Sequence, residues 1–156
     1  MRTSLKSAPP LVEGRSLDLV LQNAGRWRGL RPRALHPWLE AVVGALAPEV
    51  TSLGVRFCGD CAIRELNRQF RGRDEVTDVL SFPGEAAMEE GHLGDVVVCV
   101  PRARCQAAER GDPLEREIRT LLLHGVLHCL GYDHETDDGE MDRLERRLRR
   151  RWLQTP

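Results

Sequence analysis

One segment near the C-terminal end, LLLHGVLHCLGYDH at residues 121–134, constrains this chain more than any other. His124 and His128 are four residues apart, so on a helix their side chains lie on one face, one turn apart. Gly131 can take the left-handed conformation that ends a helix and reverses the chain. That reversal could bring His134 back beside the other two histidines. The spacing predicts a helix, a tight turn and a three-histidine metal site.

Three imidazoles around one ion leave a fourth position for water. This is the arrangement of catalytic zinc, whereas structural zinc is usually closed by four protein ligands. A histidine pair four residues apart is by itself more often an ordinary surface or core feature. The glycine, the third histidine and the apolar helix favour a metal, because buried polar rings need partners. We therefore predict that His124, His128 and His134 bind one Zn²⁺ ion, although imidazole ligands also suit nickel and other transition metals.

The same spacing occurs in the long zincin motif of the metzincin proteases, H-E-x-x-H-x-x-G-x-x-H. Gly125 stands where those proteases carry a glutamate general base. Without that carboxylate, a peptidase lacks the group that deprotonates water and protonates the leaving amine. A phosphodiester has a better leaving group and tolerates the loss more readily. Gly125 therefore disfavours a metallopeptidase, which is our second hypothesis.

The rest of the chain alternates strand-like and helix-like patterns, and its 156 residues are enough for one domain with its own core. We expect Pro37 in the first turn of a helix, and Asp60 and Asp112 as N-caps. We predict a single α+β domain with a mixed four-stranded sheet, packed by about five helices that include a zincin-like metal helix. The predicted strands cover residues 16–22, 51–57, 78–82 and 93–100. The predicted helices cover 36–47, 61–70, 101–111, 112–131 and 136–153, the last with Met141, Leu144, Leu148 and Trp152 on its inner face.

No apolar run reaches the length of a membrane span, and the first 14 residues lack the apolar core of a secretory signal. We therefore expect a cytoplasmic protein whose five cysteines are reduced thiols. The net charge of −1 produces no global basic field, so composition neither requires nor excludes a nucleic-acid partner. Cys58 and Cys61 have C-x-x-C spacing, which could mean a redox pair or a Cys₂His₂ zinc site with His124 and His128. We prefer two ordinary thiols, because the intervening stretch is far longer than in a zinc finger.

Three blocks make the chain resemble the YbeY family of bacterial endoribonucleases and rRNA maturation factors. They are HGVLHCLGYDH at 124–134, LNRQFRGRDEVTDVLSFP at 66–83 and LGDVVV at 93–98. One departure is Val76, where the family usually has proline, and we expect a looser turn there. The resemblance extends over about residues 16–153. It implies a flexible N-terminal tail at 1–15 and a YbeY-like metal-dependent hydrolase domain at 16–156.

The resemblance implies a zinc-dependent, single-strand-specific endoribonuclease that matures the 3′ end of small-subunit rRNA and takes part in ribosome quality control. Its partners would be single-stranded RNA, rRNA and the small ribosomal subunit, with no membrane and no DNA expected. By position, Arg71 matches an arginine of the family's functional cleft. A guanidinium there would stabilise the negative charge of a phosphoryl transition state. A non-catalytic ribosome assembly factor with a structural zinc is the third hypothesis.

Several charged residues near these motifs could have an ordinary structural role instead of a catalytic one. Arg71 could pair with Asp74 or Glu75, and Arg73 is a weaker candidate for the same catalytic task. Residues 133 and 135, an aspartate and a glutamate, flank the third histidine and could orient a ligand or shuttle a proton. Both could equally be surface charges.

The arginine-rich stretch RLERRLRRRW at 143–152 could bind RNA phosphates. It could also be a solvated helix face whose arginines pair with Glu140 and Glu145, and we prefer this second interpretation. His36 and His92 stand alone in the sequence, and we assign neither a function.

Overall fold

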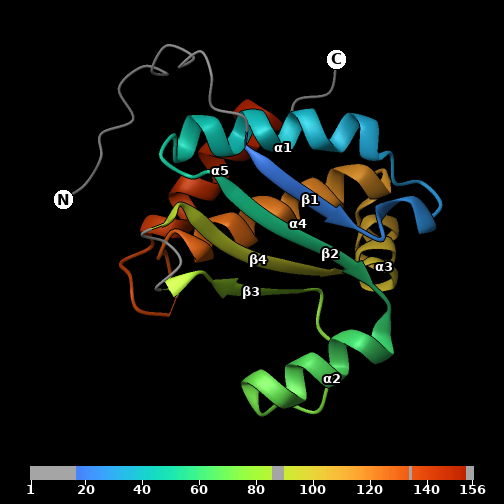
Figure 1. Ribbon diagram of the computed structural model, residues 1–156. Coiled ribbons are helices and arrows are strands. Elements are labelled where there is room, and N and C mark those ends of the chain that lie inside the picture. The colour runs from blue at the N-terminus through green and yellow to red at the C-terminus, as the bar shows by residue number, and fades with distance from the viewer. Residues whose placement is uncertain (1–16, 86–89, 134, 154–156) are drawn as a thin grey trace.

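A mixed four-stranded sheet forms the centre of the molecule (Figure 1). The computed structural model describes residues 17–85, 90–133 and 135–153. The strands are β1 (Asp18–Gln22), β2 (Ser52–Cys58), β3 (Val79–Pro83) and β4 (His92–Cys99). Their order is β1-β2-β4-β3, with β1, β2 and β4 parallel and β3 antiparallel to β4. The predicted mixed sheet and the hairpin-like pairing of residues 78–100 are confirmed.

The helices divide between the two faces of this sheet. They are α1 (Pro32–Leu46), α2 (Asp60–Arg71), α3 (Val100–Arg110), α4 (Leu114–Cys129) and α5 (Glu140–Trp152), with a short 3₁₀ helix η1 at Ala24–Arg26. Helices α1, α3 and α4 share one apolar core with the strands, whereas α2 stands apart below the sheet in Figure 1. Ile63 of α2 packs with Leu80 and Val97 on the opposite face, the open face, which no other described helix covers. In the part of the chain that is described, no helix is long and apolar enough to cross a membrane.

Helix α4 is the central helix, because it is buried on two sides. One side joins the sheet core, in which Ile118, Leu122 and Val126 are fully buried. A second side, with Leu123 and Leu127, packs against α5 in a separate cluster. That cluster contains three of the four residues that we expected on the inner face of the last helix, Met141, Leu144 and Leu148, with Trp152 packed partly buried against it.

Gly125 allows α4 to lie very close to the sheet. A Cβ atom added at this glycine would come within 2.6 Å of Val96 Cγ1 and 3.2 Å of Ser81 Oγ. Real Cβ atoms essentially never come as close as 2.6 Å to another atom, so any larger residue at 125 requires the helix or Val96 to move. The glycine is therefore a packing requirement of the contact between α4, β3 and β4.

Two details of the predicted helices were wrong. Helix α1 begins at Pro32, so Pro37 lies inside it and removes one intrahelical hydrogen bond. The earlier start follows from Leu35, which is buried in the sheet core and extends the apolar stripe by one turn. Neither Asp60 nor Asp112 caps a helix: the N-caps of α2 and α4 are Gly59 and Pro113.

The two aspartates have other partners that explain this outcome. Asp60 is the first residue of α2, and its Oδ1 accepts a hydrogen bond from the Cys99 thiol at 3.2 Å. Asp112 lies 3.8 Å from Arg116 in an ion pair. Both carboxylates still lie near a helix N-terminus, where negative charge is favourable.

We predict that Gly125→Ala lowers the free energy of unfolding by about 1–3 kcal/mol, because overpacking a tight contact costs this much. An alanine in a helix interior would otherwise stabilise by about 1 kcal/mol relative to glycine. Gly44→Ala is the matched control, because a Cβ at Gly44 in α1 meets no atom within 4 Å. Urea denaturation of both variants measures the effect, and Val96→Ala should partly rescue Gly125→Ala. Equal stabilisation by the two alanines would contradict the packing argument.

Candidate functional site

His124 and His128 lie on the side of α4 that the sheet and α5 leave partly exposed. Both are partly exposed, whereas every other residue from 121 to 129 is buried. Their Nε2 atoms face each other at 2.9 Å, and their ring centroids are 4.5 Å apart. The helical spacing therefore brings the two side chains together, as the sequence suggested. We had expected them to be more deeply buried.

A buried carboxylate holds the opposite nitrogen of His124. The Nδ1 atom of His124 is hydrogen-bonded to Oε1 of Glu145 on α5, whose exposed fraction is 4%. The other oxygen of this carboxylate lies 3.4 Å from Arg149. A neutral imidazole that donates from Nδ1 has its lone pair on Nε2. Glu145 therefore favours the tautomer whose Nε2 lone pair points toward His128.

This donor set fits a metal ion. Metal-binding histidines usually donate their other ring N–H to a carboxylate, and Glu145 supplies this contact to His124. Of the predicted ligands, His134 lies outside the described residues. Within the described ranges alone, no group of three or more histidine, cysteine, aspartate or glutamate side chains is arranged to hold a metal. The structure thus places two of the three predicted ligands.

The chain turns after α4 at Gly131, as we predicted from the sequence. Gly131 has φ +99°, and its N–H donates to the carbonyl of His128 at 3.0 Å. The N–H of Tyr132 donates to the carbonyl of Leu127 at 3.1 Å. These bonds direct the chain back from the helix immediately before residue 134.

Among the described residues, Asp133 organises its own loop and makes no hydrogen bond to the two histidines of α4. Its Oδ1 accepts a hydrogen bond from the backbone N–H of Glu135 at 3.0 Å, and the Glu135 side chain is exposed. The carboxylate that orients a histidine is Glu145, which we had placed on a solvated face. A signal for it existed, because Glu145 follows Met141 by four residues on the apolar side of the last helix.

The position of Gly125 bears on the peptidase hypothesis. The glycine faces Val96 and Ser81 of the sheet, so a side chain there would meet strand atoms at once. A glutamate at 125 would require α4 to move away from the sheet. The packing therefore supplies a physical reason for the absence of the zincin general base, and the metallopeptidase is disfavoured further.

Arg71 does not pair with Asp74 or Glu75. Its guanidinium donates to the backbone carbonyl of Ser81 on β3 at 2.6 Å and lies over the ring of Phe82, 5.6 Å from the centroid. Ser81 also faces Gly125, which lies between the two histidines. The edge strand β3 therefore connects Arg71 to the histidine-bearing part of α4.

The loop after Arg71 is held by Asn67, which is buried at 4% exposure. Its side-chain amide donates to the carbonyl of Glu75 at 3.0 Å, and its backbone carbonyl accepts from the N–H of Arg73. Val76, at the position of the family's usual proline, packs partly buried against the cluster between α2 and the sheet. Sequence reasoning missed Asn67, although a polar residue on the apolar side of a helix is the signal for such an anchor.

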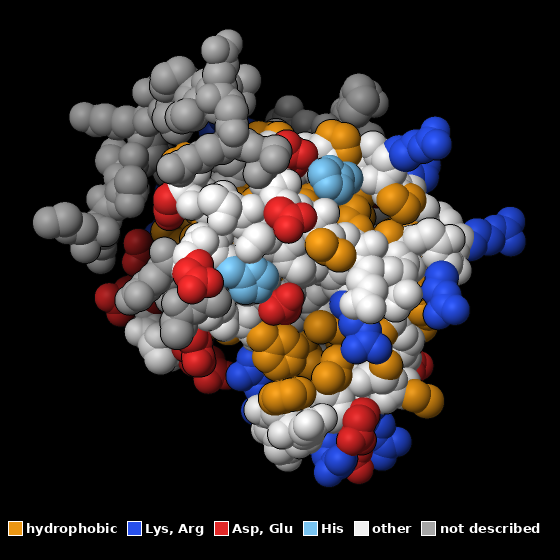
Figure 2. Space-filling model, in the orientation of Figure 1, with side chains coloured by type: hydrophobic (Ala, Val, Ile, Leu, Met, Phe, Trp, Pro, Cys, Tyr) orange, Lys and Arg blue, Asp and Glu red, His pale blue; other side chains and the backbone are white. Residues whose placement is uncertain are grey.

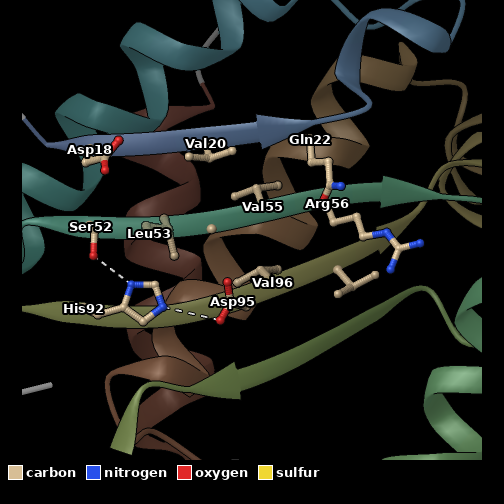
Figure 3. Close-up of a pocket in the computed structure, with 12 residues that line it drawn as sticks. Asp18, Val20, Gln22, Ser52, Leu53, Val55, Arg56, His92, Asp95 and Val96 are labelled. Carbon is tan, nitrogen blue, oxygen red and sulfur yellow. Dashed lines mark hydrogen bonds and ion pairs between the residues drawn. The ribbon is translucent and has the colours of Figure 1, made fainter. Parts of the chain in front are cut away.

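A shallow hollow of about 390 Å³ lies on the open face of the sheet (Figure 3). Its floor includes His92, whose Nδ1 lies 2.7 Å from Ser52 Oγ and whose Nε2 lies 3.4 Å from Asp95 Oδ2. The lining also combines Asp18 with Arg56, and it includes none of the predicted site residues. The Asp95 side chain is largely exposed, and its contact with His92 is long. The contacts from Ser52 through His92 to Asp95 are therefore accessible to solvent. No local pattern pointed to it, because Ser52 and His92 are 40 residues apart.

The cysteines behave as ordinary thiols. All five are free; Cys61 and Cys105 are exposed, and the other three are buried. Cys58 packs between α2 and the sheet, and no metal-holding group joins these described cysteines to the α4 histidines. The Cys₂His₂ alternative is therefore wrong. Burial raises the pKa of the Cys99 and Cys129 thiols to about 12, so neither forms a thiolate near neutral pH.

Comparisons with known proteins place this chain in a family. The family model described as Endoribonuclease YbeY matches residues 29–153. An Aquifex aeolicus protein of that name is 43% identical over 122 residues, which are 78% of this chain and 81% of the relative. One from Solibacter usitatus is 53% identical over 91 residues, and the matched part spans only 59% of its length. A solution structure of a Thermotoga maritima protein matches with a TM-score of 0.58 at 30% identity, covering 88% of this chain and 92% of the other.

We predict that a thiol reagent at pH 8 modifies two of the five cysteines in the native protein, Cys61 and Cys105. The other three should react only after denaturation, because they are buried and burial raises the pKa of each thiol. Mass spectrometry after iodoacetamide treatment, with and without urea, identifies the modified positions. Rapid native modification of Cys58 together with Cys61 would instead indicate an accessible redox pair.

Proposed function

This chain belongs to the endoribonuclease YbeY family, and from that premise we propose that it is a metal-dependent hydrolase that cuts single-stranded RNA. The observation that carries the proposal is the pair of histidine Nε2 atoms that meet at 2.9 Å beside a buried, tautomer-selecting carboxylate. The two histidines lie within the family match, as does Arg71.

In this proposal His124, His128 and His134 hold one Zn²⁺ ion. Zinc bound by three imidazoles supplies Lewis acidity and lowers the pKa of a coordinated water to about 7. Glu145 keeps the His124 ring in the required tautomer and orientation through Nδ1. Arg149, 3.4 Å from the same carboxylate, supports its negative charge in a buried position.

Arg71 is the residue that we propose for stabilising the phosphodiester. Its guanidinium donates a hydrogen bond to the carbonyl of Ser81, the β3 residue whose side chain faces Gly125. One of its five N–H donors makes that bond, and a guanidinium offers further donors to phosphate oxygens. A positive charge there opposes the negative charge that gathers in a phosphoryl transition state.

The cellular role that we propose is maturation of the 3′ end of small-subunit rRNA and ribosome quality control in the cytoplasm, with the small ribosomal subunit as partner. Its support is membership of a family whose relatives are named as endoribonucleases. The substrate class, RNA, follows from that same name.

A catalytic metal is favoured over a structural one by the way in which the protein is packed. Both main apolar clusters, one at the sheet and one between α4 and α5, consist of aliphatic and aromatic side chains that pack without any metal. A chain with such a core does not need a metal to fold. Removal of the metal is therefore expected to abolish activity while the far-UV circular dichroism spectrum persists.

We predict that the zinc-loaded chain cuts a labelled single-stranded RNA containing the small-subunit rRNA 3′ end, and that the metal-stripped chain and His128→Ala do not. Gel analysis of the products measures cleavage. His36→Ala is the matched control, because His36 forms an i,i+4 contact with Glu40 on the exposed side of α1 and its loss should leave cleavage unchanged. Equal cleavage by all four preparations would identify a contaminant, and cleavage by none would favour a purely binding role on the ribosome.

We predict that Glu145→Gln weakens zinc binding about 10–100-fold, because removal of a carboxylate that orients a metal-binding histidine typically costs this much. Competition with a chromogenic chelator measures the affinity. Asp142→Asn is the control, since Asp142 forms an i,i+4 ion pair with Arg146 on the same helix, as Glu145 does with Arg149. Equal affinities of the two variants would remove Glu145 from the metal site.

A further inference from the structure

Phe70 is an exposed aromatic side chain at the end of α2. Its exposed fraction is 56%, and Val20, at 57%, is the other large hydrophobic residue so exposed among the described residues. Single exposed apolar residues are common on proteins and need no explanation. Phe70 is different because it belongs to a cluster. Figure 2 shows apolar side chains gathered at the lower part of the open face, where α2 meets the sheet, with cationic side chains beside them.

The cluster consists of Phe70, Arg71 and Phe82. The two phenyl rings meet edge to face, with centroids 5.3 Å apart and an interplanar angle of 72°. The guanidinium of Arg71 lies over the Phe82 ring and is anchored to Ser81. Phe82 pairs with Asp95 in the sheet register, which places its side chain on the open face. Two rings and a guanidinium are thus held together at the surface by β3.

Arg71 differs from the neighbouring arginines in whether a carboxylate balances its positive charge. Arg64 pairs with Asp74, Arg68 with Glu65, and Arg73 lies 3.9 Å from Glu75. Within the described part of the chain, the guanidinium of Arg71 contacts a backbone carbonyl and an aromatic ring, and no carboxylate. It therefore keeps an uncompensated positive charge beside exposed aromatic surface.

We propose that Phe70, with Phe82 and Arg71, forms a stacking site for one unpaired nucleobase of the RNA substrate. Base stacking on an aromatic ring needs a π-face and tolerates any base, and an adjacent arginine suits the following phosphate. A base held in a duplex cannot be splayed onto such a ring, so the site also selects single strands. This inference rests on the proposed function and adds a specificity-determining residue, Phe70, to it.

The location of the site suits that role. Arg71 is anchored on Ser81, and Ser81 faces Gly125 between His124 and His128. The stacking site and the histidines are therefore connected through a single residue of the edge strand. Phe82 lies on the open face and α4 packs on the other face, so an RNA strand whose base rests on Phe70 would have its phosphate at Arg71 and would pass around the edge strand β3 to reach the histidines.

The test measures binding of two probes to the zinc-loaded, full-length chain. One is a fluorescent single-stranded oligoribonucleotide, and the other has the same length but abasic sites in place of its bases. Stopped-flow anisotropy measures binding before cleavage shortens the probe, and steady-state assays supply KM and kcat. The variants are Phe70→Ala, Phe70→Leu, which keeps an apolar side chain without a ring, and Phe70→Tyr, which keeps the ring. Val20→Ala is the matched control for removing exposed apolar surface.

We expect Phe70→Ala and Phe70→Leu to weaken binding of the base-bearing probe about five-fold or more, and to raise KM accordingly. Binding of the abasic probe should not change, Phe70→Tyr should resemble the wild type, and zinc content should be equal in all variants. Wild-type affinity in Phe70→Ala, or an equal loss for both probes, would overturn the stacking site while leaving the nuclease assignment in place. A wild-type chain that neither binds nor cuts the RNA would overturn both.

Discussion

The close contact of α4 with the sheet at Gly125 is the constraint on which the rest of the structure depends. Because a Cβ at this position would meet Val96 at 2.6 Å, the helix can pack at this distance only with glycine there. The same helix is covered by α5 through Leu123 and Leu127. With two sides buried, one stripe stays accessible, and His124 and His128 occupy it. Packing thus sets the direction in which the histidines point.

Two other elements, α5 and β3, complete the surroundings of α4. Glu145 arrives from α5 because Met141, Leu144 and Leu148 dock that helix on α4, and the buried carboxylate then finds a partner in Nδ1 of His124. From the other side, β3 brings Ser81 against the glycine and presents its carbonyl to Arg71. The polar groups are therefore positioned by the apolar contacts of the elements that carry them.

Much of the fold and part of the site were predictable because they depend on local pattern. Alternation located β1 and β2, and short apolar runs located β3 and β4. The i,i+4 spacing placed His124 and His128 side by side. The errors occurred where tertiary partners competed with local preference. Asp60 binds the Cys99 thiol instead of capping α2, and α1 extends back to Pro32 because Leu35 is buried in the core. Local propensity is a weak guide when a distant partner is stronger.

By itself, the sequence determined the helix with its paired histidines, the turn at Gly131 and the family blocks, since each is contained in a short run of residues whose spacing fixes its geometry. Only the tertiary structure decided that Glu145 is the carboxylate on His124, that Arg71 is anchored on Ser81 without a carboxylate partner, and that Phe70 and Phe82 meet at the surface. The residues of the first two contacts are 21 and 10 positions apart along the chain. Such contacts arise from how whole helices and strands dock, because the burial of their apolar faces is what brings the side chains within reach.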